Sequence, residues 1–248
     1  MKKDIKKDIK IEDRVIISID TSLKENVFRL CSLINNKVST LKLGLEVIYS
    51  NGFDIIKSVI SFGYKVMLDL KFLDIPNTVS NAIKAVVTPG VSKLTIHTTG
   101  GENMLKSALS SVRKKSDELN INPPKIFGVT ILTSLDNQDL EKIGYRYTLL
   151  EEVLRLSKLA LLCNLEGVIC SPNEVLALRE NFGNSLLIAT PGIRLENDMS
   201  NDQKRYNTPY NAIKNGADYI IIGRSITGSS NPSQVIDLIL EQVSKALI

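Results

Sequence analysis

Histidine is almost absent from the 248-residue sequence, which holds a single example, His97. A transition-metal site built from several histidines is therefore excluded, although carboxylates could still hold Mg²⁺. The three cysteines, Cys31, Cys163 and Cys170, are widely spaced and form no C-x-x-C pair. This pattern argues against both a disulfide framework and a zinc site, so we expect them to be small buried hydrophobes. The chemistry must then rest on lysine, aspartate and arginine.

Long apolar runs are missing too. No run of 18 apolar residues exists for a membrane span, and the lysines near the start are not followed by the apolar segment of a secretory signal. The net charge of +4 is mild, and residues 1–10, with five lysines and two aspartates, account for +3 of it. A nucleic-acid-binding protein would concentrate positive charge on its folded body. We therefore expect a cytoplasmic protein that binds neither membranes nor nucleic acid.

Short runs rich in β-forming residues recur along the chain, with helix-favouring segments between them. The expected strands are Val15–Asp20, Thr40–Leu45, Lys65–Leu70, Lys93–Thr98, Ile126–Leu132, Gly167–Ser171, Leu186–Gly192 and Tyr219–Ser225. The expected helices are Ser22–Asn35, Glu46–Ser61, Asn77–Val87, Glu102–Lys115, Leu149–Cys163, Asn173–Asn181, Pro209–Asn215 and Pro232–Ala246.

Eight such units in sequence predict an α/β fold, a single-domain (β/α)₈ barrel of the TIM type. The alternative is an open, doubly wound sheet, which would normally begin with a glycine-rich turn. The segment Ile19-Asp20-Thr21-Ser22 contains no glycine. We therefore expect a lysine-rich tail over residues 1–12 and a catalytic barrel over residues 13–248.

The end of the third predicted strand and the residues just after it carry an unusual set of charges. Asp69 and Lys71 are two residues apart, so a regular strand would place them on one face with Cα atoms roughly 6.5 Å apart. Asp74 comes just beyond the strand, and Pro76 suits the first turn of a helix. A solvated ion-pair network at a surface turn is the alternative to a functional site. The predicted barrel favours the functional site, because catalytic residues lie at the carboxyl ends of barrel strands.

Lys42 on the second strand joins these residues in an alternating set of two ammonium and two carboxylate groups, Lys42, Asp69, Lys71 and Asp74. Alternation keeps each group ionised, so Lys71 should stay protonated and able to stabilise a carbanion and protonate it. Lys42 alone could simply extend its ammonium group to solvent.

The last strand predicts a phosphate site. Its apolar run ends in Gly223-Arg224, where glycine allows close approach of a ligand and arginine can hold phosphate through two hydrogen bonds. The polar segment Arg194–Tyr206 is suited either to a lid over the site or to a solvated loop. For His97 we expect a structural, hydrogen-bonded ring and not a catalytic group, because Lys71 can already supply the proton.

The run Asp69-x-Lys71-x-x-Asp74-Ile75-Pro76-Asn77-Thr78 resembles the signature of the orotidine 5′-monophosphate decarboxylases. The resemblance covers nearly the whole chain after the tail. Its accompanying motifs are Asp20, Lys42 with Gly44, Leu132-Thr133-Ser134, Pro191-Gly192-Ile193-Arg194, Asp202-Gln203-Lys204-Arg205 and Gly223-Arg224. Thr98-Thr99 departs from it, because small apolar residues are commoner there in the family.

The resemblance implies a decarboxylation of orotidine 5′-monophosphate to uridine 5′-monophosphate without cofactor or metal. Lys71 would protonate C6, with Asp69 beside the departing carboxylate. Contacts to the rest of the substrate are implied for Lys42 and Asp20 at the ribose, for Thr133 and Ser134 at the pyrimidine, and for Arg194, Gln203, Gly223 and Arg224 at the phosphate. Asp74, Ile75 and Thr78 would enter the active site of a partner subunit, which makes the enzyme a homodimer with shared sites.

Two other functions stay open at this point. A sugar-phosphate decarboxylase of the same superfamily shares the D-x-K-x-x-D core, but would be expected to use Mg²⁺ and to lack the strand-five and lid motifs. A catalytically silent barrel could bind a nucleotide as a sensor or scaffold. The intact Lys71 and Asp74 argue against this second alternative.

Overall fold

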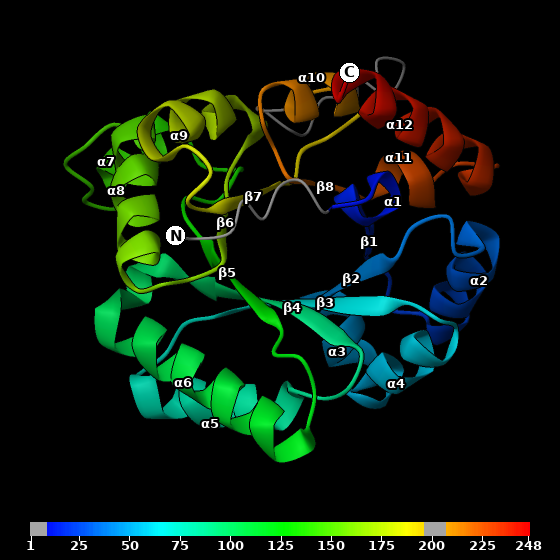
Figure 1. Cartoon of the computed structure of the whole chain (residues 1–248), viewed down its shortest axis with the longest axis horizontal. Coiled ribbons are helices and arrows are strands. Elements are labelled where there is room, and N and C mark those ends of the chain that lie inside the picture. The colour runs from blue at the N-terminus through cyan, green and yellow to red at the C-terminus, as the bar shows by residue number, and fades with distance from the viewer. Residues whose placement is uncertain (1–8, 196–206) are drawn as a thin grey trace.

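The computed structural model describes residues 9–195 and 207–248. At its centre is a closed barrel of parallel strands that pair in chain order, with β8 pairing back to β1 (Figure 1). The strands are β1 (Val15–Ile19), β2 (Thr40–Gly44), β3 (Lys65–Phe72), β4 (Val91–His97), β5 (Lys125–Val129), β6 (Gly167–Ile169), β7 (Leu187–Thr190) and β8 (Tyr219–Ile222). The predicted (β/α)₈ barrel is confirmed.

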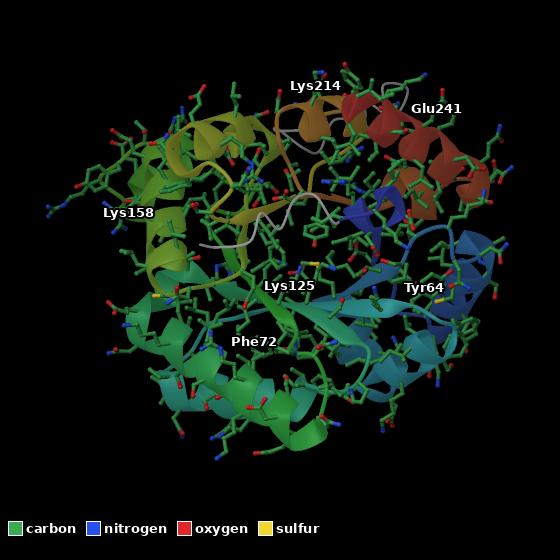
Figure 2. All side chains as sticks on the ribbon, viewed as in Figure 1. Tyr64, Phe72, Lys125, Lys158, Lys214 and Glu241 are labelled. Atoms are coloured by element: carbon green, nitrogen blue, oxygen red, sulfur yellow. The ribbon has the colours of Figure 1, made fainter. Side chains whose placement is uncertain are left out.

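Helices surround the strands on all sides in Figure 1. They are α1 (Ile11–Arg14), α2 (Lys24–Ile34), α3 (Leu45–Asn51), α4 (Asp54–Ser61), α5 (Pro76–Val86), α6 (Gly101–Leu119), α7 (Asn137–Lys142), α8 (Leu149–Leu162), α9 (Val175–Phe182), α10 (Pro209–Lys214), α11 (Arg224–Thr227) and α12 (Pro232–Ala246), with short 3₁₀ turns η2 (Thr98–Gly100) and η3 (Pro172–Glu174). Charged side chains such as Lys158, Lys214 and Glu241 lie on the outer surface of this layer (Figure 2).

Two hydrophobic cores hold the fold together. The larger one lies between the strands and the helices, where the apolar stripes of the helices bury against outward-facing strand residues, and it includes Cys31, Cys163 and Cys170 as free buried thiols. The smaller one fills the barrel interior, where the rings of Phe127 and Tyr219 meet edge to face with centroids 5.9 Å apart. The barrel is thus a packed core with open ends, as is usual for this architecture.

Several predicted boundaries are wrong in detail. The expected helix Glu46–Ser61 is two helices, because Gly52 ends α3 with a φ of 71°. Helix α7 was not among the predicted helices. It begins with a reciprocal capping box between Asp136 and Asp139. At the amino end, α1 runs across the predicted tail boundary after residue 12. The division into tail and barrel domain stays a prediction.

In the described part of the chain, no helix combines the length and apolar character that crossing a bilayer requires.

Candidate active site

A cavity of about 290 Å³ opens at the carboxyl ends of the strands. It is lined by side chains from strands or following loops all around the barrel, among them Asp20, Lys42, Asp69, Lys71, Thr133, Arg194, Gly223 and Arg224. Sequence analysis singled out all of these positions. Their convergence on one mouth follows from the closed parallel topology, which brings every strand end to the same rim.

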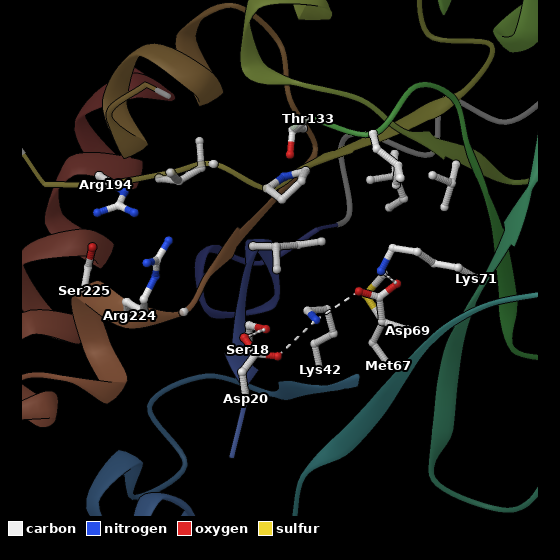
Figure 3. A pocket seen from close by; sticks show the side chains of 18 of the residues that line it. Ser18, Asp20, Lys42, Met67, Asp69, Lys71, Thr133, Arg194, Arg224 and Ser225 are labelled. Atoms are coloured by element: carbon white, nitrogen blue, oxygen red, sulfur yellow. Dashed lines mark hydrogen bonds and ion pairs between the residues drawn. The ribbon is translucent and has the colours of Figure 1, made fainter. Parts of the chain in front are cut away.

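Four of these residues form a row of alternating charge on β1, β2 and β3 (Figure 3). The ammonium of Lys42 lies 2.9 Å from Asp69 Oδ2 and 3.8 Å from Asp20 Oδ1, and the ammonium of Lys71 lies 2.9 Å from Asp69 Oδ1. The strand register makes this possible, because Gly44 on β2 stands opposite Asp69 on β3. Asp69 therefore forms ion pairs with two lysines, one through each carboxylate oxygen.

Asp69 and its two lysines differ in how far they are buried. Burial of Asp69 acts to raise its pKa, but the charges of Lys42 and Lys71 and their hydrogen bonds outweigh it and lower the pKa from 3.8 to about 2. Lys42 is at least as buried as Asp69, whereas the side chain of Lys71 is 32% exposed and lines the cavity. A permanently ionised carboxylate thus faces a cation that solvent or substrate can reach.

The backbone at Lys71 differs from a regular strand. Lys71 has a φ of 48°, and the pairing of β3 with β4 shifts register between Leu68 and Phe72. Both side chains reach the same cavity as expected, but regular strand alternation, the expected reason, is wrong. A left-handed conformation at a residue other than glycine is strained by about 1–3 kcal/mol, and such strain is found mainly at functional sites.

Thr95 on β4 secures this strained turn. Its hydroxyl accepts a 3.0 Å hydrogen bond from the backbone N–H of Lys71 and donates a 2.9 Å hydrogen bond to Asp69 Oδ1. Thr95 is 1% exposed, so water does not compete for these bonds. Thr95 was not predicted as a site residue. The available signal was its place on β4 two residues before His97, because residues two apart on a strand point to the same face.

Ser18 and Ser225 were also missed, and both line the cavity. The hydroxyl of Ser18 donates a 2.8 Å hydrogen bond to Asp20 Oδ2, which orients that carboxylate. Its position two residues before Asp20 on β1 was the available signal. Ser225 directly follows Arg224. It was not predicted as a site residue because the last strand was expected to include it.

Two guanidinium groups, Arg194 and Arg224, lie at the side of the cavity opposite Lys71 (Figure 3). Strand β8 ends at Ile222, and Arg224 begins the short helix α11, so the predicted strand Tyr219–Ser225 is too long. The bend comes at Gly223, where an added Cβ would lie 3.5 Å from Asp20 Oδ2. Gly223 itself lines the cavity between these two sides.

The remaining predicted residues fall in three groups. Thr133 follows β5 and points into the cavity in Figure 3, whereas its neighbour Ser134 is not among the lining residues. Gln203 and the rest of residues 196–206, most of the predicted lid segment, lie outside the described residues. Asp74, Ile75 and Thr78 are exposed at the start of α5 and do not line the cavity of their own chain.

His97 ends β4 and is half-buried. Within the described residues its ring makes no hydrogen bond, so the expected hydrogen-bonded role is wrong. Burial lowers the pKa of His97, and the nearby charge of Lys71 lowers it further against the opposing effect of Asp69. The ring is consequently neutral near pH 7. Within residues 9–195 and 207–248, no three His, Cys, Asp or Glu side chains are grouped so that they could hold a metal ion.

Comparison with known proteins agrees with this geometry. The model of the "Orotidine 5'-phosphate decarboxylase / HUMPS family" matches residues 13–239. A Buchnera aphidicola (subspecies Schizaphis graminum) protein named orotidine 5'-phosphate decarboxylase is 42% identical over 233 residues, covering 93% of this chain and 95% of the relative. Its counterpart of the same name from Ehrlichia canis is 40% identical over 230 residues, with coverage of 93% and 97%.

Among solved structures, the orotidine 5'-phosphate decarboxylase of Lactobacillus acidophilus superimposes with a TM-score of 0.83 at 36% identity, covering 93% of this chain and 99% of that one. The family model's match over residues 13–239 includes every strand of the barrel and the whole charged row. The chain therefore belongs to the orotidine 5'-phosphate decarboxylase / HUMPS family.

Proposed function

We propose that this protein decarboxylates orotidine 5′-monophosphate to uridine 5′-monophosphate, the last step of de novo pyrimidine nucleotide synthesis. The relatives that match over almost their full length carry this name. The observation that carries the proposal is the pair of 2.9 Å contacts that hold Asp69 ionised between Lys42 and Lys71. Such a row suits a reaction that turns a carboxylate into a carbanion.

The substrate has a natural orientation in the cavity. Its phosphate would lie against Arg194 and Arg224, because guanidinium groups bind phosphate through paired hydrogen bonds. The ribose would meet Asp20 and Lys42, and Thr133 would contact the pyrimidine edge. This order places C6 and its carboxylate at Lys71, across the cavity from the phosphate, as Figure 3 shows for the protein groups.

In the proposed chemistry the bond between C6 and the carboxylate breaks, and its electron pair stays on C6. The resulting carbanion is not delocalised by the ring, so electrostatic stabilisation and binding must provide most of a barrier reduction of roughly 8–23 kcal/mol. The Lys71 ammonium stabilises the developing charge and donates its proton to C6. Lys71 then recovers a proton from water. No step in this sequence requires a cofactor as electron acceptor.

Asp69 has two roles in this proposal. Its low pKa, about 2, keeps it anionic near neutral pH, and this negative charge lies 2.9 Å from the Lys71 ammonium. It also holds negative charge beside the substrate carboxylate, which can raise the energy of the bound substrate relative to the transition state. The strained backbone of Lys71 and the Thr95 hydrogen bonds fix the distance between the two groups.

A homodimer with shared sites completes the proposal. Asp74, Ile75 and Thr78 face solvent. The segments after the paired strands β2 and β3 carry large apolar side chains that are exposed: Tyr49 is 84% exposed, Ile75 67%, Leu73 55% and Phe53 54%. Exposed apolar side chains grouped in this way are typical of an interface. A second copy of the chain bound there would bring these residues toward the first copy's cavity.

Two alternatives are separable by one assay. A Mg²⁺-dependent sugar-phosphate decarboxylase would lose activity in EDTA and would not act on the nucleotide, and a silent barrel would bind without turnover. Incubation with orotidine 5′-monophosphate in EDTA should instead show a steady loss of orotate absorbance. Absence of turnover at micromolar protein over hours would contradict the proposal.

A further inference from the structure

A second cavity, of about 610 Å³, lies at the opposite end of the barrel, where the strands begin. Its lining residues include Asp13, Lys65, Lys93, Asn120, Asn122 and Lys125. The paired rings of Phe127 and Tyr219 fill the barrel between this cavity and the candidate active site. The two cavities are therefore separate, and the proposed decarboxylation uses none of these residues.

Lys93 is the unusual residue of this cavity. It stands on the inward side of β4, two residues before Thr95, and is only 7% exposed. Its ammonium lies 4.9 Å from the centroid of the Tyr219 ring. In the described chain it makes no hydrogen bond or ion pair. A buried cation held only by an aromatic face is costly, because its lost hydration is poorly replaced.

Two more lysines surround Lys93. Lys125 is its direct neighbour in the pairing of β4 with β5, and Lys65 begins β3 on the other side. Asp13 from α1 is the one acid among the described lining residues, and it lies 3.9 Å from Lys65 and accepts a hydrogen bond from Ser39. With three lysines against one aspartate, the lining carries an excess charge of +2 when Lys93 is protonated.

We propose that this end of the barrel binds a doubly charged oxyanion, inorganic phosphate or the phosphate group of a small monoester, between Lys93, Lys125 and Lys65. The double negative charge of the ligand would balance the excess charge of +2 on the lining. Asn120 and Asn122 also line this cavity, and an asparagine side chain carries an amide N–H group that can donate to an oxyanion. Lysine ammonium groups are compact charges, so a cluster of lysines without an arginine attracts phosphate mainly by its charge.

The protonation of Lys93 couples to this binding. Burial lowers its pKa to about 8, and the charge of Lys125 adds to the effect, with a smaller contribution from Lys65, against the opposing effect of Asp13. Tyr219 stays un-ionised, since burial raises its pKa to about 12. A bound dianion raises the pKa of Lys93 again. Binding above pH 8 therefore takes up a proton, and affinity falls as pH rises beyond about 8.

Titration calorimetry with inorganic phosphate tests the site in the full-length protein. Lys93→Met keeps the length of the side chain and removes its charge, and Lys158→Met, at an exposed position of α8, is the matched control. We expect the Lys93 variant to lose one phosphate site or to weaken it at least tenfold, with decarboxylation unchanged, and the control to match the wild type. Phosphate bound at Arg224 contributes equally to all three proteins, so this test is independent of the active-site assignment.

Three further measurements complete the design. Lys125→Met should reproduce the loss if Lys93→Met does not fold. Sulfate, which stays doubly charged across the range, should bind with proton uptake above pH 8 in the wild type but not in the variant. Glycerol 3-phosphate identifies whether a monoester binds more tightly than inorganic phosphate. Equal phosphate affinity and stoichiometry in the wild type and both lysine variants would overturn the proposal.

Discussion

Thr95 Oγ1 lies 3.0 Å from the backbone nitrogen of Lys71 and accepts its hydrogen bond. The same hydroxyl donates to Asp69, so a residue on β4 fixes both partners of the ion pair on β3. Because φ of Lys71 is 48°, this nitrogen has left the regular ladder of the sheet and needs another acceptor. Thr95 is therefore a positioning residue for the proposed proton donor.

Replacing Thr95 by valine should lower kcat and leave substrate binding nearly intact. The change leaves the buried N–H of Lys71 without a partner, which costs about 1–3 kcal/mol, or roughly 10- to 100-fold in kcat if the loss falls on the transition state. Thr95→Ser keeps the hydroxyl and is the control. Steady-state kinetics with separate kcat and KM checks this. A valine variant with normal kcat would show that the hydroxyl has no part in catalysis.

Lys71→Ala should abolish decarboxylation while the protein stays folded. The other ammonium of the row, Lys42, is held between Asp20 and Asp69 and is less exposed to the cavity. Circular dichroism and binding of uridine 5′-monophosphate establish that the variant is intact. Turnover within tenfold of the wild type would remove Lys71 as the proton donor.

Mixing Lys71→Ala with Asp74→Ala should regenerate activity after subunit exchange. Each parent is expected to be inactive, because one lacks the proton donor and the other lacks the charge that a second copy should contribute. A mixed dimer holds one site with both wild-type groups. Exchange is monitored by native mass spectrometry. If mixed dimers form and activity stays at the level of the parents, the shared-site model is wrong.

Arg224→Ala should lower kcat/KM by roughly 100-fold or more, about 3 kcal/mol of transition-state stabilisation, as expected for a charged hydrogen bond in a desolvated site. The group lies across the cavity from Lys71, so its effect on chemistry must act through binding of the remote phosphate (Figure 3). Added guanidinium ion should restore part of the activity. An equally large loss on the phosphate-free nucleoside would show that Arg224 does not bind phosphate.

Asp69 should also contribute to stability in a defined pH window. Its folded pKa, about 2, lies below that of the unfolded chain, so the contribution is present above pH 4 and is lost as pH falls from about 4 to about 2. The size is on the order of 2 kcal/mol. Urea unfolding at pH 5 and pH 2.5 measures it. The difference in unfolding free energy between the wild type and Asp69→Asn should shrink at the lower pH, and a constant difference would contradict the assigned pKa.

The sequence predicted the barrel and the location of the charged residues well, because both depend on local patterns. Apolar runs flanked by turn residues mark the strands, and parallel closure then brings Asp20, Lys42, Asp69 and Arg224 to one rim. Gly52 was overlooked as a helix end, since the apolar periodicity continues past it into α4.

The contacts between strands could not be predicted in the same way. Alternation shows that Thr95 and Lys93 face inward, but not which residue on β3 or β5 each one meets. That pairing depends on register, and the register shift after Leu68 cannot be seen in the sequence. The left-handed turn at Lys71 was unexpected for the same reason, because a lysine gives no local signal for a positive φ.

The edge-to-face rings of Phe127 and Tyr219 have a consequence for the traffic of small molecules through the proposed enzyme. The rings and the apolar residues around them leave the barrel axis filled, so carbon dioxide formed at Lys71 has no passage through the far end. The gas and the nucleotide must leave by the mouth through which the substrate entered. If the proposed phosphate contacts hold the nucleotide, we expect carbon dioxide to leave the cavity before it.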